Sequence, residues 1–275
     1  MQPTLPLAKG YLCNHLQWIK NYLYKHTGIA LNDNKQALVT SRLERRLRHH
    51  ACLSYNEYFQ QLGTPDRDGE ATIVIDLLTT NETYFFREPQ QFKFLAEQVL
   101  AFYPPGEPLR FWSAASSSGE EAYTLAMLVA QFPRLRHWEI VGTDISTRML
   151  KKARQGLYPL SAAEKIPQSL LEKFCLKGNE QYEGMFLIEP NLRSKVSFLY
   201  ANLTEQLPKI GLFHVIFLRN VMIYFDKHTK QQLLDRIQHH LRPGGYFFIS
   251  QAESLNGLRC DLKMVSPSIY QKIAD

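Results

Sequence analysis

The 275-residue sequence has no long hydrophobic run and only four cysteines, and these absences exclude several classes of protein. No stretch approaches the roughly 20 consecutive apolar residues that a membrane-spanning helix requires. The first residues, MQPTLPLAKGYL, lack the charged segment and apolar core of a secretory signal, so we expect a cytoplasmic protein without membrane insertion. Cys13, Cys52, Cys175 and Cys260 form no CxxC pair, so we expect neither a disulfide framework nor a metal site.

Glycine is scarce where a phosphate-binding turn would need it. Residues 111–123, FWSAASSSGEEAY, predict a buried strand, a turn and a helix, yet they contain only Gly119. A pyrophosphate turn uses the spacing GxGxxG so that backbone amides approach the ligand closely. Glu120 and Glu121 follow the glycine and would repel a diphosphate, although one of them also suits the positive end of a helix without any ligand.

The first 80 residues show helical periodicity. With 45% hydrophobic residues, the chain has enough apolar material for a packed core. Ser54 and Glu57 form a capping box that predicts a short helix to Leu62, and the turn TPDRDG precedes a further helix around 73–78. The apolar residues that recur at three- and four-residue spacing include Leu12, Leu16, Ile19, Leu23, Leu38, Leu43 and Leu47.

From residue 109 the pattern changes to short β-rich runs, separated mostly by segments long enough for helices. The runs are LRFWSAA, WEIVGTDI, VSFLYANL, HVIFLRN and YFFIS. This alternation predicts an α/β domain with a largely parallel sheet. Ser146 is a predicted N-cap. The inward faces predicted for the first two helices are Ala122, Leu125, Ala126, Val129 and Phe132, and Met149, Leu150 and Ala153.

Polar residues follow four of these strands at their carboxyl ends, where parallel sheets bind ligands. Asp144 ends the second strand, and a carboxylate there can accept hydrogen bonds from both hydroxyls of a ribose. Together with the acidic turn, this favours a ligand with a ribose and a positive charge, and S-adenosylmethionine has both. The other polar residues at strand ends are Ser116–Glu121, Asn202, Arg219 and Asn220.

Positive charge is concentrated in residues 41–50, SRLERRLRHH, although the net charge of the whole chain is only +6. Glu44 is the sole acidic residue in this stretch. Taken alone, the stretch is equally compatible with a solvated helix face and with a surface that binds an acidic partner.

Five segments, in order along the chain, resemble the CheR family of chemotaxis methyltransferases. They are LLTTNETYFFREPQQF (77–92), FWSAASSSGEEAYTLAML (111–128), GTDIS (142–146), FLRNVMIYFD (217–226) and LRPGGYFF (241–248). TTNETYFFRE and RNVMIYFD are highly specific, because no generic structural reason brings them together. Members of this bacterial family transfer a methyl group from S-adenosylmethionine to glutamate side chains of chemoreceptor (methyl-accepting chemotaxis protein) cytoplasmic domains. The products are glutamate methyl esters, which serve sensory adaptation, and S-adenosylhomocysteine.

The resemblance implies a fold and a domain organisation. The fold is a Rossmann-like α/β methyltransferase domain with a mostly parallel sheet, an inserted small antiparallel β-subdomain and an N-terminal all-helical domain. Residues 1–80 would form the helical domain with its basic docking helix, and 81–108 a linker that contributes to the cofactor site. Residues 109–275 would form the methyltransferase domain, with the subdomain at about 158–193.

The resemblance also assigns site residues one by one. Positions that match the family's catalytic and methyl-transfer residues are Arg87, Arg219 and Tyr224. Positions that match its S-adenosylmethionine ligands are Asn81, Thr83, Arg87, Glu121, Asp144, Asn202, Leu203, Arg219 and Asn220. Glu121 would bind the α-ammonium group, Asp144 the ribose, and Asn202 with Leu203 the adenine.

The implied partner is the helical bundle of a chemoreceptor's cytoplasmic domain. The resemblance makes docking the favoured interpretation of the basic helix, through a stripe formed by Arg42, Arg45, Arg46 and His49. Some members also bind a pentapeptide at the receptor C-terminus through the inserted subdomain, and the sequence leaves that use open here. We expect a monomer that binds no nucleic acid.

Two other functions remain in view. A nucleic-acid methyltransferase would also explain the basic helix, but amine-directed enzymes usually carry an Asn/Asp-Pro-Pro-aromatic turn where this chain has RNVMIYF. A non-catalytic scaffold would have lost ligand residues, and every matched position is filled. Methylation of glutamate needs no general base, because the carboxylate is already ionised at neutral pH. Alignment of the reacting atoms would then be the main task of the site.

Overall fold

The computed structural model describes residues 9–31, 36–62 and 69–273, and the chain forms two compact units. One unit comprises residues 1–80 together with 224–229, and the other comprises 81–223 together with 230–275. The side chains of 9–16 and 36, Leu12 and Leu16 among them, lie outside the described residues.

The first unit is helical, as predicted. Ile19, Leu23 and Leu43 from the predicted periodicity are buried in one core, with Tyr58 and Phe59 beside them. Half of the predicted capping box is present, because the backbone N–H of Glu57 donates to Ser54 Oγ at 3.2 Å, whereas Glu57 Oε2 accepts the N–H of Leu53, the residue before the cap, at 2.9 Å. The helices are α1 (Lys9–Thr27), α2 (Gln36–His49), α3 (Tyr55–Leu62) and α4 (Glu70–Leu78).

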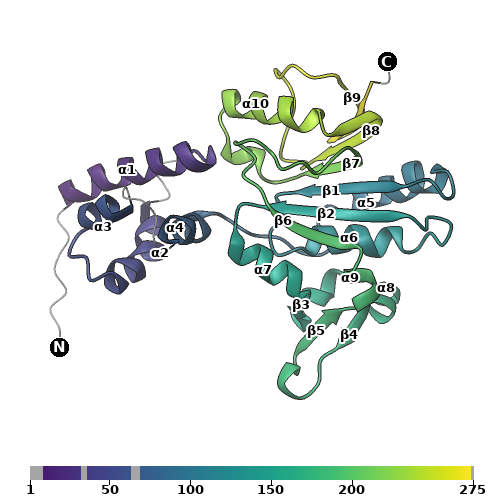
Figure 1. The fold of residues 1–275 in the computed structure, drawn as a ribbon, viewed down its shortest axis with the longest axis horizontal. Coiled ribbons are helices and arrows are strands. Elements are labelled where there is room, and N and C mark those ends of the chain that lie inside the picture. Colours follow the sequence, from purple (N-terminus) through teal and green to yellow (C-terminus); the bar gives the residue numbers. More distant parts are fainter. Residues whose placement is uncertain (1–8, 32–35, 63–68, 274–275) are drawn as a thin grey trace. The chain divides into compact units, whose positions relative to one another are not determined.

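The second unit is built on a seven-stranded sheet with the order β6-β2-β1-β7-β8-β10-β9 (Figure 1). All five predicted strands are present and pair in parallel, which confirms the α/β fold. Strands β1 and β7 are buried along nearly their whole length, which is typical of a parallel sheet that is covered on both faces. The strands are β1 (Leu109–Ala114), β2 (Trp138–Asp144), β6 (Val196–Tyr200), β7 (Phe213–Leu218), β8 (Leu241–Ile249), β9 (Leu262–Ser266) and β10 (Ile269–Lys272).

Two helices follow the first two strands and pack on the sheet. Every residue of α6 (Glu120–Val129) is buried, so this helix has no solvent face, and the predicted inward residue Phe132 lies beyond its end. Helix α7 (Thr147–Gln155) begins at the predicted N-cap, where Ser146 Oγ accepts the backbone N–H of Met149 at 3.2 Å. Its inward residues are Met149, Leu150 and Ala153, as predicted.

The predicted antiparallel subdomain is present as a three-stranded sheet with the order β3-β5-β4. Figure 1 shows it projecting from the β6 side of the large sheet. The strands are β3 (Leu157–Pro159), β4 (Cys175–Lys177) and β5 (Met185–Ile188), and they are accompanied by α8 (Gln168–Phe174) and α9 (Pro190–Arg193).

Other parts of the second unit were not expected. Residues 89–102, within the predicted linker, form a continuous helical segment of α5 (Pro89–Phe94), the π-helical η2 (Leu95–Val99) and η3 (Leu100–Phe102). Its Phe92 and Leu95 are buried in the main core, so the segment belongs to the folded unit. The antiparallel hairpin β9–β10 was also missed, because the exposed β9 shows no apolar alternation. Helix α10 (Lys227–Gln238) precedes β8, and its residues from Lys230 onward belong to this unit.

In none of the residues that the structure describes is there a helix long and apolar enough to cross a membrane.

Candidate functional site

The turn between β1 and α6 has an unusual backbone. Ala115, Ser117 and Gly119 all have positive φ, at 65°, 48° and 96°. A Cβ atom on Gly119 would lie 2.9 Å from the Cβ atom of Ala153, so only glycine fits there. The turn also holds the Ser116 hydroxyl, which is buried without a hydrogen-bond partner. The strand end therefore contains a polar atom that still lacks a partner.

Asp144 joins this turn to the start of the next helix. Its Oδ2 accepts the backbone N–H of Ser117 and its Oδ1 accepts that of Ser146, both at 2.8 Å. The side chain is buried, with the whole residue only 6% exposed. These two hydrogen bonds from backbone N–H groups fix the orientation of the carboxylate at the carboxyl end of β2. This is the place predicted for a ribose ligand.

Glu121 is paired with Arg219, which follows β7. Arg219 Nε donates to Glu121 Oε2 at 2.6 Å, and Ser113 Oγ donates to Glu121 Oε1 at 2.7 Å. The side chains of Arg219 and Glu121 are 2% and 11% exposed. The negative charge predicted to attract an ammonium group is therefore balanced by an internal guanidinium.

Arg219 makes its other contacts inside the protein as well. Its Nη1 donates to the backbone carbonyl of Arg87 at 2.7 Å and to Gln91 Oε1 at 3.1 Å. Its guanidinium carbon lies 5.2 Å from the centroid of the Phe92 ring and 5.4 Å from that of Phe217. These contacts join segment 87–92 to the end of β7.

The other residues predicted from TTNETYFFRE lie just before α5. The carbonyl of Asn81 accepts a hydrogen bond from Ser117 Oγ at 3.0 Å, which brings this segment to the β1–α6 turn. Arg87 Nη1 donates to the carbonyl of Glu82 at 2.9 Å, and its guanidinium carbon lies 5.5 Å from the centroid of the Tyr84 ring. Thr83 is half-buried.

The segment predicted to hold adenine follows β6. Asn202 is 6% exposed, and its Oδ1 accepts the backbone N–H of Thr204 at 3.1 Å and the Thr204 hydroxyl at 2.8 Å. Leu203 is buried beside it. The N–H of Ala201 donates to the Asp144 carbonyl at 3.1 Å, so this segment adjoins the end of β2.

Asn220 has a left-handed backbone conformation, with φ of 57°. Its Nδ2 donates to Ser250 Oγ at 2.7 Å, which connects the ends of β7 and β8. Tyr224 ends the short 3-10 helix η6 (Met222–Tyr224) and is half-buried. The fold thus gathers the carboxyl ends of β1, β2, β6, β7 and β8 at one edge of the sheet.

Two buried carboxylates behave differently in the first turn of α6. Burial raises the pKa of Glu120, although hydrogen bonds from the Ser118 hydroxyl to both of its oxygens act in the opposite direction. Glu121 faces Arg219 instead. Of the two acidic residues, Glu121 therefore contacts Arg219 at the end of β7, whereas Glu120 contacts Ser118 in its own turn.

Sequence reasoning missed four residues of this network: Glu88, Gln91, Ser250 and Glu253. Gln91 Nε2 donates to the Ile249 carbonyl at 2.6 Å, and Ser250 Oγ donates to Glu88 Oε1 at 2.8 Å. Ser250 is the last residue of YFFIS and Glu253 lies three positions later, so the strand-end rule applied to this fifth strand finds them. Glu88 and Gln91 lie on α5 and its N-terminal cap, away from any strand end, and their sequence signal is their place in the matched segment LLTTNETYFFREPQQF.

In the helical unit, the four predicted docking residues are placed differently from one another. Arg42 Nη1 donates to the carbonyls of Leu77 and Thr79, at 2.8 and 3.2 Å. Arg46 Nε donates to Glu70 Oε1 at 2.9 Å. Arg45 and His49 are exposed. Two of the four predicted cations are therefore engaged by residues of α4 and its C-terminus.

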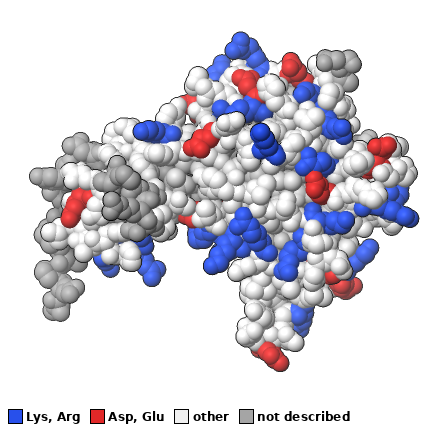
Figure 2. All heavy atoms as spheres, viewed as in Figure 1, with Lys and Arg blue, Asp and Glu red and all other residues white. Residues whose placement is uncertain are grey.

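Helix α7 is a second cationic helix, which composition alone did not single out. Its sequence TRMLKKARQ has no acidic residue, and Figure 2 shows Lys and Arg side chains gathered over it. The exposed cations are Arg148, Lys151, Lys152 and Arg154. Positive charge is thus distributed over both units.

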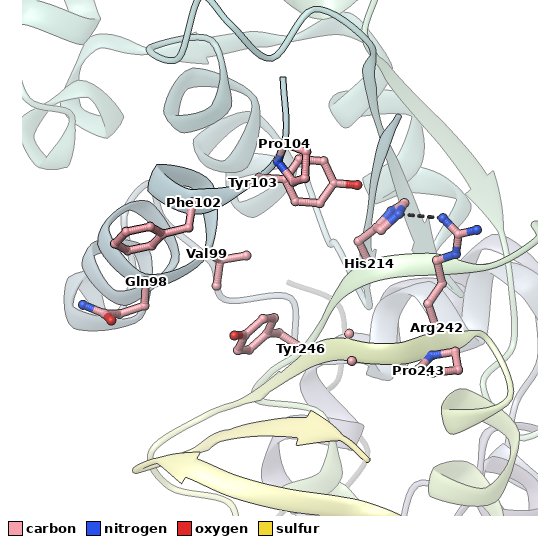
Figure 3. Close-up of a pocket in the computed structure, with 11 residues that line it drawn as sticks. Gln98, Val99, Phe102, Tyr103, Pro104, His214, Arg242, Pro243 and Tyr246 are labelled. Atoms are coloured by element: carbon pink, nitrogen blue, oxygen red, sulfur yellow. Dashed lines mark hydrogen bonds between the residues drawn. The ribbon is translucent and has the colours of Figure 1, made fainter. Parts of the chain in front are cut away.

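A separate hollow of about 450 Å³ lies at the other end of the sheet, by the first residues of β7 and β8 (Figure 3). His214 contacts Arg242 Nη1 at 2.7 Å through its Nε2 atom. Burial and then the Arg242 and Arg110 guanidiniums lower the pKa of His214 to about 4. None of the predicted cofactor residues lines this hollow.

Within the described ranges there is no group of three or more His, Cys, Asp or Glu side chains suited to a metal ion.

Comparison with known proteins identifies the family of this arrangement. The model of the CheR methyltransferase SAM binding domain matches residues 81–270, and that of the CheR methyltransferase all-alpha domain matches residues 14–79.

The chain belongs to the CheR methyltransferase family.

Curated relatives within this family match nearly the whole chain. Chemotaxis protein methyltransferase 2 of Pseudomonas aeruginosa is 40% identical over 267 residues, covering 94% of this chain and 93% of that protein. Chemotaxis protein methyltransferase Cher2 of Pseudomonas putida is 37% identical, covering 91% and 94%. The chemotaxis protein methyltransferase of Escherichia coli is 35% identical, covering 93% and 90%.

The second unit of this CheR-family chain is therefore an S-adenosylmethionine-binding methyltransferase domain. The residues at the strand ends fit that cofactor. The buried Ser116 hydroxyl lacks a partner, and Asp144 is held in place by two amides. Leu203 is a buried apolar side chain suited to contact with a purine ring, whereas the amide of the neighbouring Asn202 is bonded to Thr204 and Glu205.

Proposed function

We propose that this chain transfers a methyl group from S-adenosylmethionine to glutamate side chains of chemoreceptor cytoplasmic domains, forming methyl esters. The observation that carries the proposal is the group of polar strand ends around Asp144. The relatives support it, because all three are named chemotaxis protein methyltransferases. The proposal also includes a monomer that acts in the cytoplasm, where such receptor domains lie.

Bound S-adenosylmethionine supplies an activated methyl group attached to a sulfonium. We propose that Asp144 holds the ribose, that Asn202 and Leu203 hold the adenine, and that Glu121 receives the α-ammonium group. Asn81 and Thr83 would complete the cofactor site. These residues bind and orient, which is most of what the reaction asks of the protein.

Charge at the site is arranged by Arg219. Arg219 pairs with Glu121 at 2.6 Å and also lies 3.7 Å from Glu88 Oε2, so one guanidinium faces two carboxylates and holds Glu121 in a fixed direction. We propose that Arg219 acts on the reaction through Glu121 and through the carbonyl of Arg87, and that Arg87 and Asn220 line the acceptor side. Tyr224 would orient the acceptor or the methyl group without transferring a proton.

The acceptor itself needs no activation. A glutamate carboxylate is ionised at neutral pH, with an ordinary pKa of about 4.3, so it attacks without a general base.

The small antiparallel sheet has a free edge that suits a polypeptide partner. Within the described residues, β4 pairs with β5 on one side only. We propose this edge as the place where a receptor C-terminal peptide adds a strand.

The decisive experiment is methyl transfer with the purified chain and methyl-labelled S-adenosylmethionine. The acceptors are a receptor cytoplasmic fragment, the same fragment with its methylation-site glutamates changed to alanine, and total RNA. We expect label in the first fragment only, released as methanol by mild base, since carboxyl esters are base-labile. Label in RNA, or base-stable label in the fragment, would overturn the proposal in favour of a nucleic-acid or amine methyltransferase. No label in any acceptor, with the cofactor bound, would indicate a scaffold.

A further inference from the structure

Glu253 lies beyond β8, yet its carboxylate organises the loop that follows β7. Oε1 accepts the backbone N–H groups of Val221, Met222 and Ile223, at 2.9, 2.8 and 3.3 Å. Oε2 accepts the N–H of Asn220 at 3.1 Å and that of Ser250 at 2.9 Å. One carboxylate therefore binds four consecutive amides of the loop and one of its own turn.

These hydrogen bonds supply acceptors for backbone N–H groups that no helix or strand satisfies at this point. Four successive N–H groups that converge on one anion have no carbonyl partners of their own, so without Glu253 they would lose their acceptor. No described Lys, Arg or His lies within ion-pair distance of Glu253, so the backbone dipoles alone stabilise its charge. Burial raises the pKa of Glu253, and the backbone hydrogen bonds act against that rise.

The loop that Glu253 holds carries residues at the proposed reacting centre. It begins at Asn220, directly after Arg219, and Asn220 has a left-handed φ of 57°, a conformation that is uncommon for non-glycine residues and that Asn tolerates better than most. Asn220 is fixed from two sides, because its Nδ2 donates to Ser250 Oγ, which in turn donates to Glu88 Oε1. Glu88 also accepts the N–H of Gln251 at 3.2 Å.

We propose that Glu253 is a positioning residue for methyl transfer, which fixes residues 220–223 so that Asn220 meets the acceptor in one orientation. The proposal rests on the proposed function for its substrate. It differs from the cofactor contacts, because no atom of Glu253 needs to touch either reactant. A loop that is displaced by about 1 Å aligns the acceptor poorly even when the cofactor remains bound.

The test compares Glu253→Gln and Glu253→Asp with the wild-type chain and with Glu107→Gln, which replaces an exposed carboxylate on the loop before β1. The amide of Glu253→Gln offers one acceptor oxygen and turns an NH2 group toward backbone donors, whereas Glu253→Asp keeps the charge on a shorter arm. The measurements are kcat and KM for the receptor fragment, S-adenosylhomocysteine affinity by calorimetry, and hydrogen exchange of amides 220–223.

We expect Glu253→Gln to lower kcat at least tenfold, with KM and S-adenosylhomocysteine affinity within threefold of wild type and faster exchange at 220–223. Glu253→Asp should recover part of kcat, and Glu107→Gln should match wild type. The proposal is overturned if kcat of Glu253→Gln stays within twofold, if kcat and cofactor affinity fall equally, or if neither variant folds. An inactive wild-type control would instead count against the proposed function.

Discussion

At the level of single residues, Asp144 connects two loops and the proposed ribose site with one carboxylate. The amides of Ser117 and Ser146 each bind a different oxygen, so the carboxylate is oriented before any ligand arrives. Such preorganisation lowers the entropy lost on binding. A substitution here is therefore expected to act on cofactor affinity first.

We predict that Asp144→Asn lowers the affinity for S-adenosylhomocysteine at least tenfold. The amide keeps the size of the side chain but removes the charge, and hydrogen bonds to a charged group contribute about 1.5 to 3 kcal/mol each. Titration calorimetry measures the effect, with Asp261→Asn as the matched control on an exposed loop. Unchanged affinity in Asp144→Asn would remove this residue from the cofactor site.

At the level of elements, α2 has two polar flanks with different roles. Arg42 and Arg46 lie next to the buried stripe of Val39 and Leu43, and their guanidiniums bind the C-terminal end of α4 and Glu70. Arg45 and Arg48 are exposed, and Arg48 pairs with Glu44 at 2.7 Å. The flank that is open to an acidic partner is therefore the one with Arg45, Arg48 and His49.

We predict that the double change Arg45→Glu and Arg48→Glu slows methylation of the receptor fragment roughly fivefold or more at low salt, through like-charge repulsion. The effect should shrink as salt rises, because exposed charges are screened over about 8 to 10 Å. S-adenosylhomocysteine affinity should not change. Steady-state rates at two salt concentrations measure this, with Arg136→Glu as the control. Intact rates at low salt would show that the receptor docks elsewhere.

The ion pair between α2 and α4 makes a separate contribution to stability. Burial alone would raise the pKa of Glu70, but hydrogen bonds from Arg46, Tyr58 and His50 outweigh it, and the pKa is lowered from its ordinary 4.5. A carboxylate whose pKa is lowered by folding stabilises the folded state at pH values above its pKa in the unfolded chain. That stabilisation is lost as the pH falls through the pKa of the folded state.

We predict that the helical unit loses stability as the pH falls below about 4.5, and that Glu70→Gln flattens this dependence. At pH 7 the variant should cost about 1 to 3 kcal/mol, because it leaves buried donors without a charged acceptor. Hydrogen exchange of the amides of α3 and α4, corrected for intrinsic rates, measures both effects. Glu44→Gln is the control, since Glu44 belongs to an exposed pair. Equal acid sensitivity in Glu70→Gln and wild type would assign the acid response to other groups.

At the level of the whole molecule, the two ends of the large sheet have different chemistry. The carboxyl ends of the strands carry the Asp144, Glu121 and Arg219 network, whereas the amino ends carry the hollow of Figure 3 with His214 and Arg242. Doubly covered parallel sheets bind ligands at the carboxyl ends, because loops and helix N-termini meet there.

We predict that S-adenosylhomocysteine slows hydrogen exchange at residues 113–121, 144–146 and 201–203 and leaves 241–246 unchanged. Ligand binding stabilises the segments it contacts by mass action, by about 2.7 kcal/mol when the ligand is at 100 times its Kd. Exchange followed by mass spectrometry, with and without the ligand, locates the protected segments. Protection confined to 241–246 would place the cofactor at the wrong end of the sheet for this proposal.

The sequence determined the order and type of the main elements and the polar strand ends. Apolar periodicity is a local property, so the strands ending at Ala114, Asp144 and Leu218 and the capping box at Ser54 could be predicted from neighbouring residues. The long segments such as TTNETYFFRE also sufficed for the family, since they are specific without any coordinates.

Only the tertiary structure decided which residues meet across the chain. Arg219 reaches Glu121 from 98 positions away, and Glu253 holds the amides that follow Asn220, because neighbouring strands bring their ends together. Helical spacing placed Arg42 and Arg46 on one stripe with Arg45 but could not show which of them α4 covers. The helical period determines where each side chain lies around the helix axis, whereas the packing of other elements decides which of those side chains face solvent.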